Sequence, residues 1–335
     1  MLTQRMLQIF KCIVDDFVKT AEPVGSKTLM EKYLLPYSSA TIRNDMGTLE
    51  ELGYLEKTHT SSGRVPSIEG YRFYCEYLME NQVDKNVEYE IVQAFNGSSL
   101  NLEDVIKESC DILSRMINLT AGVLGPDSSN ETLEHIKLFP IDNKSAVCVF
   151  ITNSGHTENR LFNFDDNISL KDVQTCCDIL NDRLKGSKLV DAVERLELLR
   201  PILAEKITKY ELLFNVFMKS FIRFASDNIY FSGQSNMLYQ PEFADVEKLK
   251  QIMNLLDQEN GWRDLSLASS QLALNTIKGT KLVWLDDLAV ISSPYTVDNH
   301  TGQLIVVGPP RMNYDKIVGM LEFISQTIED TYRSK

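Results

Sequence analysis

Apolar residues recur at every third or fourth position over the first eighty residues of the chain, which predicts a series of short amphipathic helices. The expected helices cover 3–20, 27–33, 38–52 and 67–79, with Ser26 and Ser38 or Ser39 as capping residues. Gly53 suits the left-handed conformation just past the end of the third helix. Two short strands, 54–58 and 64–66, flank a turn at 60–63. This order of elements within about 65 residues is typical of a winged helix-turn-helix.

The third of these helices carries polar side chains suited to recognising DNA bases. With Ile42 facing the core, Ala40, Arg43, Asn44 and Gly47 point outward on a helical wheel, and Thr41 lies to one side. Arginine can bind guanine O6 and N7, asparagine can pair with adenine N6 and N7, and small residues let a helix lie deep in the major groove. Phosphate contacts are expected from Lys27, Thr28, Thr58, Thr60, Ser61, Ser62 and Arg64, the last of which could also reach the minor groove.

The same pattern is compatible with two other interpretations. The helix could be a solvated one with an incidental Arg43–Asn44 pair, and winged helices also bind proteins. Glu50 and Glu51 are unfavourable for DNA binding, whereas Asp45 could either repel phosphate or orient Arg43.

Downstream of a polar linker at 81–101, the pattern predicts an α+β domain interrupted by helices. Expected helices are 102–119, 169–184, 201–224, 243–259 and 313–331, and the expected strands are 133–140, 145–152, 157–164, 229–232, 281–292 and 304–307. The predicted domains are therefore a head at 1–80, an α+β domain formed by 100–165 and 228–335, and a helical insertion at 166–227. No internal repeat or low-complexity segment is present.

The last helix of the insertion has an apolar stripe with heptad-like spacing and many aromatic side chains. Two interpretations stay open: a helix buried inside the domain, or a surface through which two copies associate. The stripe consists of Leu203, Ile207, Tyr210, Phe214, Phe217, Phe221 and Phe224.

Composition narrows the class of protein. With 43% hydrophobic and 24% charged residues, and no apolar run of membrane-spanning length or signal peptide, the chain is expected to be cytoplasmic. The net charge is −13, yet residues 1–66 hold eight basic and eight acidic residues and are neutral overall, so the head is compatible with DNA binding if its basic residues cluster. The six cysteines and four histidines lack metal-ligand spacing, and no phosphate-binding glycine loop is present. We therefore expect no metal, no cofactor and no enzymatic activity.

Several strings along the chain closely resemble the bacterial heat-inducible transcription repressor family HrcA. These strings are Glu22-Pro23-Val24-Gly25-Ser26-Lys27-Thr28-Leu29, Ser39-Ala40-Thr41-Ile42-Arg43-Asn44-Asp45-Met46, His59-Thr60-Ser61-Ser62-Gly63-Arg64-Val65-Pro66, Gly70-Tyr71-Arg72, Gln240-Pro241-Glu242-Phe243 and Gly308-Pro309-Pro310-Arg311-Met312. The resemblance covers essentially the whole chain. Gly47, Ser62 and Pro310 depart from the residues usual in the family, but Arg43 and Asn44 do not.

The resemblance implies a repressor with a winged helix-turn-helix, a GAF-like domain and a dimerising domain inserted into it. It also implies that a homodimer binds an inverted-repeat operator, called CIRCE, before chaperone operons, and that the GroEL chaperonin helps the repressor reach its active fold. For the heptad-like stripe, it favours a dimer contact. Because GAF-like domains elsewhere hold small ligands, a ligand-sensing regulator is the alternative.

Overall fold

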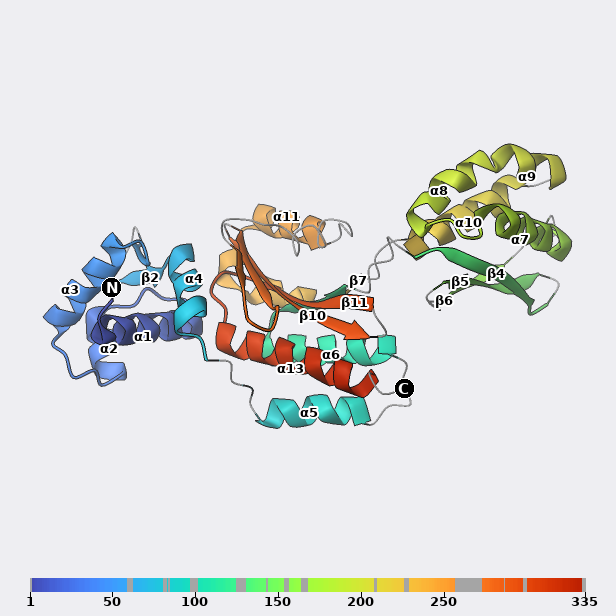
Figure 1. Cartoon of the computed structure of the whole chain (residues 1–335). Helices are drawn as coiled ribbons and strands as arrows, with labels where there is room; N and C mark the ends of the chain where they lie inside the picture. The colour runs from blue at the N-terminus through green and yellow to red at the C-terminus, as the bar shows by residue number, and fades with distance from the viewer. Residues whose placement is uncertain are drawn as a thin grey trace. The chain divides into compact units, whose positions relative to one another are not determined.

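The structure is a computed structural model of the chain. It describes residues 2–58, 63–80, 83, 85–96, 102–124, 131–142, 144–153, 157–163, 168–207, 210–225, 229–256, 273–285, 287–297 and 300–332. The chain divides into two compact units, one made of Met1–Gly125 with Ile229–Lys335 and the other of Pro126–Asn228. Each unit is mixed α and β, with antiparallel sheets, and is described by itself below (Figure 1).

The first unit begins with the helices and hairpin that the apolar spacing predicts. Its elements are α1 (Gln4–Thr20), α2 (Ser26–Lys32), α3 (Ser39–Glu51), β1 (Leu55–Lys57), β2 (Arg64–Pro66) and α4 (Ile68–Tyr77). The Thr3 hydroxyl caps α1 by accepting the Met6 N–H, and Ala21 ends it in the left-handed conformation. Ile9, Phe10 and Ile13 of α1 are fully buried with Ile42 of α3. One apolar core therefore holds α1 to α3.

The predicted linker at 81–101 contains a helix, so that prediction is wrong. Helix α5 (Lys85–Asn96) buries Val87, Ile91 and Phe95, which are spaced four apart on one face. It packs on α6 (Leu102–Ile117), and both helices belong to the same core cluster. The surrounding polar residues concealed this narrow apolar stripe.

A six-stranded antiparallel sheet forms the centre of the first unit. Its strand order is β7 (Ile229–Ser232), β3 (Thr120–Leu124), β11 (His300–Gly308), β10 (Leu288–Val297), β9 (Lys281–Leu285) and β8 (Ala273–Asn275). The prediction missed β3 and β8 and merged β9 with β10. Side chains alternate along β10, so Ile291 packs with α6 and α13 (Tyr314–Tyr332). Val290 packs on the other face with the 3-10 helices η2 (Gln234–Tyr239) and η3 (Pro241–Phe243) and with α11 (Val246–Leu256).

The second unit has a sheet of its own, which corrects the predicted domain boundary at 166. Strands β4 (Leu133–Pro140), β5 (Ser145–Thr152) and β6 (Thr157–Asn163) pair only with one another among the described residues, in the order β4-β5-β6. These strands were expected in the discontinuous α+β domain. They pack instead on helices of the insertion, because Phe150 and Phe162 both contact Phe217. The insertion is thus a complete α+β unit rather than a helical pair.

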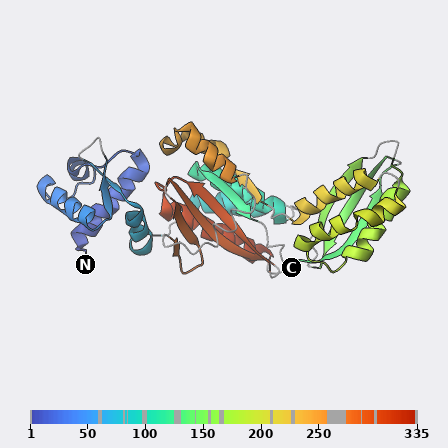
Figure 2. The ribbon, with the colours of Figure 1, turned by 90° about the horizontal axis from the view of Figure 1, so that it is seen from above.

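Four helices cover one face of this small sheet (Figures 1 and 2). They are α7 (Leu170–Leu184), α8 (Leu189–Leu198), α9 (Arg200–Lys206) and α10 (Tyr210–Ala225). The predicted capping box at Ser169 and Asp172 is confirmed, whereas the predicted helix 201–224 is interrupted between α9 and α10 and α8 was missed. Asn181 of α7 binds both the N–H and the C=O of Ile136 at 2.7 Å, which covers that edge of the sheet.

Candidate nucleic acid interface

Helix α3 is positioned by a cap at its start and by apolar contacts along its inner face. The Ser38 hydroxyl accepts the Thr41 N–H at 3.1 Å, as the sequence predicts, and its oxygen also lies 2.9 Å from the Thr41 hydroxyl. Ile42, Met46 and Leu49 are buried, and the helix ends before Gly53, whose φ is +82°. The inner face thereby fixes which residues point to solvent.

The outer face of α3 presents the residues that the helical wheel selects. Ala40, Arg43 and Asn44 are exposed, and Thr41 and Gly47 are partly exposed. Neighbouring Arg43 and Asn44 place a guanidinium and a carboxamide on one solvent-facing side, which are the groups that bind guanine and adenine edges. Their exposure is confirmed; their contact with DNA stays a prediction.

Asp45 does not orient Arg43, contrary to one of the interpretations above. Its side chain is only 11% exposed and accepts two bonds from the Arg5 guanidinium of α1, at 2.6 and 3.1 Å. The Arg5 guanidinium also lies over the Tyr37 ring, 5.6 Å from its centroid. A bidentate arginine partner neutralises this carboxylate, so Asp45 joins α3 to α1 instead of repelling a phosphate.

Arg64 is placed differently from the prediction that it contacts DNA. Its side chain is 12% exposed, and its Nε and Nη2 atoms both lie 2.8 Å from a Glu50 carboxylate oxygen of α3. Nη1 of Arg64 donates to the Gly63 carbonyl. Arg64 therefore joins the hairpin to α3, and the contact to the minor groove is withdrawn. The same ion pair neutralises Glu50, which had counted against DNA binding.

The start of α2 adds two exposed polar residues near α3. Lys27 and Thr28 are exposed, as expected of phosphate contacts. Ser26 does not cap α2 as predicted, because its hydroxyl lies 2.9 Å from the hydroxyl of Ser39 and makes no capping bond. This bond links the first residues of α2 and α3.

The tip of the hairpin, with His59, Thr60, Ser61 and Ser62, lies outside the described residues. At the end of β2 that is nearest to the turn, the backbone of Arg64 exchanges two hydrogen bonds with that of Val24, at 2.9 and 3.0 Å. A Cβ at Gly63 would come within 2.8 Å of the Pro23 backbone, so this close approach requires glycine.

The apolar stripe of the insertion is mostly inside its own unit, which corrects the prediction of a dimer contact. Leu203, Ile207, Phe214 and Phe217 are at most 2% exposed and belong to the core of the second unit. Tyr210 is partly buried, and the side chains of Phe221 and Phe224 lie outside the described part. A side chain that is fully buried inside its own unit has no surface left to contact a partner. For Leu203, Ile207, Phe214 and Phe217, the interpretation as part of a buried helix is therefore the correct one.

The described part of the chain offers neither a metal site nor a membrane span. It contains no group of three or more His, Cys, Asp or Glu side chains arranged to hold a metal ion. None of its helices has the length and apolar character needed to cross a membrane.

Comparison with known proteins identifies the family. A model of the HrcA protein C-terminal domain matches residues 103–318. The heat-inducible transcription repressor HrcA of Listeria welshimeri is 36% identical, over 98% of this chain and 97% of the relative. The repressor of the same name from Shouchella clausii is 37% identical, with the same coverage. A crystal structure of a hypothetical protein, 19% identical, superposes with a TM-score of 0.66 over 100% of this chain and 99% of its own, which shows a shared fold.

The class that these findings define is the transcription repressors, which implies that the chain binds DNA. More narrowly, the chain belongs to the HrcA family of heat-inducible transcription repressors. The function that goes with this membership is transcriptional repression of heat-shock genes.

Proposed function

We propose that residues 1–80 form a winged helix-turn-helix that places α3 in the major groove of double-stranded DNA. The observation that supports this most is the exposed Arg43–Asn44 pair on a helix whose nearby carboxylates, Asp45 and Glu50, are paired with arginines. The pairing removes the repulsion that a phosphate backbone would otherwise meet there. Ala40 and Gly47 allow close approach, and Arg43 and Asn44 contact bases.

Contacts to the phosphates come from residues around α3 and fix its register on the duplex. Lys27 and Thr28 supply them from α2, and Thr41 supplies one beside its Ser38 partner. Thr60, Ser61 and Ser62 supply them from the hairpin tip. Arg64 is not part of this set, since Glu50 holds it.

The operator is an inverted repeat of the CIRCE type located before chaperone operons, and a homodimer binds it with one head on each half-site. We place the dimer contact on the outer face of the β4-β5-β6 sheet, opposite its helices. Phe139, Val147 and Leu161 lie side by side across the three strands on that face, and Phe139 and Leu161 are 53% and 58% exposed. Exposed apolar side chains in a row are typical of an interface core.

The domain around the six-stranded sheet is GAF-like in this proposal, carries no cofactor and performs no catalysis. It would act in the cytoplasm, where bacterial operators are. The alternative, a ligand-sensing regulator, stays a prediction. A screen in which a small metabolite raises the melting temperature of the protein would favour it.

Activity depends on the GroEL chaperonin, because the repressor is marginally stable and needs assistance to fold. Heat or misfolded clients then deplete the active dimer and release the chaperone promoters. Dimerisation makes stability depend on concentration, which sharpens the response. Purified repressor should lose operator binding on repeated heating and regain it with chaperonin and ATP. Equal binding before and after heating without chaperonin would contradict this part.

Operator binding itself is tested by fluorescence anisotropy on three labelled duplexes: the inverted repeat, one half-site and a shuffled sequence. A single fixed salt concentration is required, because affinity for DNA falls steeply with salt. We expect the inverted repeat to bind about a thousandfold or more tighter than the shuffled duplex. Equal affinity for the two would exclude sequence-specific repression through this head.

A further inference from the structure

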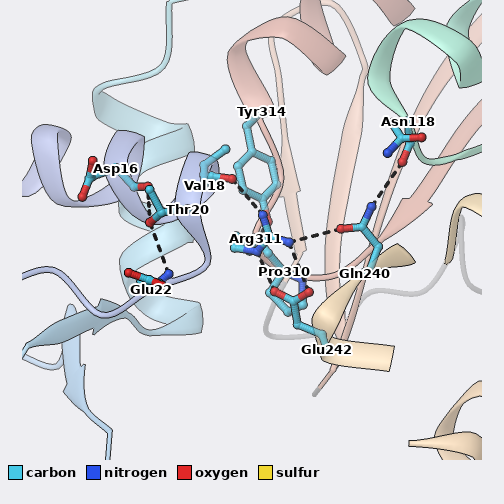
Figure 3. Close-up of polar contacts among 10 residues, drawn as sticks. All are labelled: Asp16, Val18, Thr20, Glu22, Asn118, Gln240, Glu242, Pro310, Arg311 and Tyr314. Carbon is cyan, nitrogen blue, oxygen red and sulfur yellow. Dashed lines mark hydrogen bonds and ion pairs between the residues drawn. The ribbon is translucent and has the colours of Figure 1, made fainter. Parts of the chain in front are cut away.

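Two sequence strings far apart in the chain meet beside the DNA-binding head, and the repressor function described above uses neither. Gln240 directly precedes η3, Glu242 lies within η3, and Arg311 lies between β11 and α13. The Arg311 guanidinium donates to both Glu242 carboxylate oxygens, at 2.6 and 3.2 Å, and to the Gln240 side-chain oxygen at 3.1 Å (Figure 3). The Arg311 side chain is 13% exposed.

The third nitrogen of the Arg311 guanidinium lies outside this cluster and contacts the head. Its Nη1 donates to the backbone carbonyl of Val18, in the last turn of α1, at 2.8 Å (Figure 3). The last four carbonyls of a helix lack partners within the helix and carry its negative dipole end. The N–H of Ala21 binds the Phe17 carbonyl, and Arg311 binds the next one. A cation held by the core thus supplies a hydrogen-bond donor to the C-terminal end of α1, a helix of the head.

The bonds around Arg311 fix where its guanidinium lies. Glu242 binds two of its donors, which holds the guanidinium plane. The side-chain oxygen of Gln240 accepts from Arg311, and its amide nitrogen donates to the backbone carbonyl of Asn118 at 3.2 Å (Figure 3). Asn118 lies between α6 and β3, and so the bond ties Gln240 to the six-stranded sheet. The planar guanidinium of Arg311 is therefore held by residues that are themselves bonded to the core.

A second set of bonds joins head and core close to the first. The Asp315 carboxylate, in the first turn of α13, accepts the Tyr74 hydroxyl at 2.6 Å and the Glu80 N–H at 2.5 Å. The Tyr74 hydroxyl also lies 3.3 Å from Asp15 of α1. Burial raises the pKa of the Asp15 carboxyl, and the nearby Asp315 carboxylate raises it further. A pocket of about 240 Å³ lies beside these groups.

Apolar contact across the junction does exist, for example between the Tyr71 and Tyr314 rings, whose centroids are 5.6 Å apart. Apolar burial is not directional, so it holds two bodies together without defining their angle. Bidentate, charge-assisted hydrogen bonds are directional. The polar contacts therefore add directional constraints on the orientation of the head on the core.

We propose that Arg311, held by Gln240 and Glu242, is a positioning residue that sets the orientation of the DNA-binding head on the core. This inference rests on the proposed binding of an inverted repeat by a dimer. In such a dimer the orientation of each head decides which spacing of half-sites both heads can occupy at once. Arg311 touches no DNA and contributes to the choice of operator through geometry alone.

The test compares operators whose half-sites are separated by different numbers of base pairs. The variants are Arg311→Lys, which keeps a cation for Glu242 but cannot bind three acceptors as a fork does, and Arg311→Ala. Lys248→Ala is the matched control, because it breaks an ion pair of the core, with Asp287, in which no residue of the head takes part. In both Arg311 variants, we expect the ratio of affinities between the best half-site spacing and the others to fall about tenfold. Their affinity for a single half-site should equal that of the wild type. The control should keep the wild-type dependence on spacing.

A measurement without DNA separates this inference from the proposed function. Spin labels at Glu31→Cys in α2 and Gln326→Cys in α13 report the distance between head and core, in a Cys12→Ser background. The other five cysteines are buried, so labelling is confined to the introduced sites. The distance distribution should be narrow in the wild type and clearly broader in Arg311→Lys. An unchanged distribution and spacing profile in folded Arg311→Lys would overturn the inference. If the wild type binds no operator at all, the proposed function fails, and the label distances still decide the role of Arg311.

Discussion

Helix α3 of the head and the apolar stripe of the insertion are both regular patterns, but they differ in what the sequence reveals about them. On α3 the inner face is apolar and the outer face carries Arg43 and Asn44, and the structure exposes that outer face. In the stripe every member is apolar, and the structure buries Leu203, Phe214 and Phe217 inside one unit.

The difference has a physical origin. Burial of a charged guanidinium without a partner is costly, so an arginine opposite an apolar face predicts solvent exposure. An apolar side chain gains equally from its own core and from a partner's surface, so spacing alone cannot separate the two. Chemical type therefore indicates an interface where periodicity does not.

The largest expected effect concerns the stripe. Phe217→Ala should lower the free energy of unfolding of the inserted unit by about 3–5 kcal/mol, since Phe217 is fully buried against Phe150 and Phe162. Chemical denaturation of the full chain measures it. Val216→Ala, on the neighbouring and 40% exposed position, is the control and should cost far less. Equal effects would mean that the stripe is not the core.

A smaller effect is expected at Arg64, the arginine that joins the hairpin to α3. Arg64→Ala leaves Glu50 with only its longer ion pair to Lys57, at 3.8 Å, and should lower stability by about 1–3 kcal/mol. The preference of the Arg64→Ala variant for operator over shuffled DNA should stay close to that of the wild type. Should the variant lose sequence preference while keeping its melting temperature, Arg64 would belong to the DNA contacts after all.

The outer sheet face gives the next effect. Leu161→Asp should weaken dimerisation by about tenfold, or about 1.4 kcal/mol, because it puts a charge among apolar side chains. Analytical ultracentrifugation over a range of concentrations measures this. Leu198→Asp is the matched control, since Leu198 is 76% exposed but lies on α8 rather than on the sheet. A dimer weakened by Leu198→Asp and not by Leu161→Asp would move the contact to the helices.

The smallest effect is expected at Gly47. A Cβ added there meets nothing within 4 Å, so Gly47→Ala should raise stability by about 1 kcal/mol through helix propensity. Thermal unfolding would show the gain as a higher melting temperature. If the affinity for the operator falls at the same time, the absence of a side chain at Gly47 is what lets α3 approach the groove closely.

Local patterns predicted much of the head and little of the long-range architecture. The Ser38 cap, the end at Gly53 and the buried face of α3 follow from rules that act within a few residues. The pairing of Asp45 with Arg5 and of Glu50 with Arg64 depends on how separate elements come together, so spacing could not reveal it. The membership of β4 to β6 in the insertion was missed for the same reason, because an alternating strand does not identify its partner sheet.

The role of α3 is tested most directly by combining a change in the protein with a change in the base that it is proposed to bind. Operators in which single guanines are replaced by 7-deazaguanine lack the N7 acceptor. For the wild type, replacing one symmetric pair of guanines should reduce the binding free energy by about 1–3 kcal/mol. Arg43→Ala should bind the unmodified operator more weakly than the wild type, and the same replacement should not change its affinity. Arg115→Ala, which changes an exposed arginine of α6, should behave as the wild type. If Arg43→Ala and the wild type lose equal affinity at every replaced guanine, Arg43 does not bind a base and the proposed recognition by α3 is wrong.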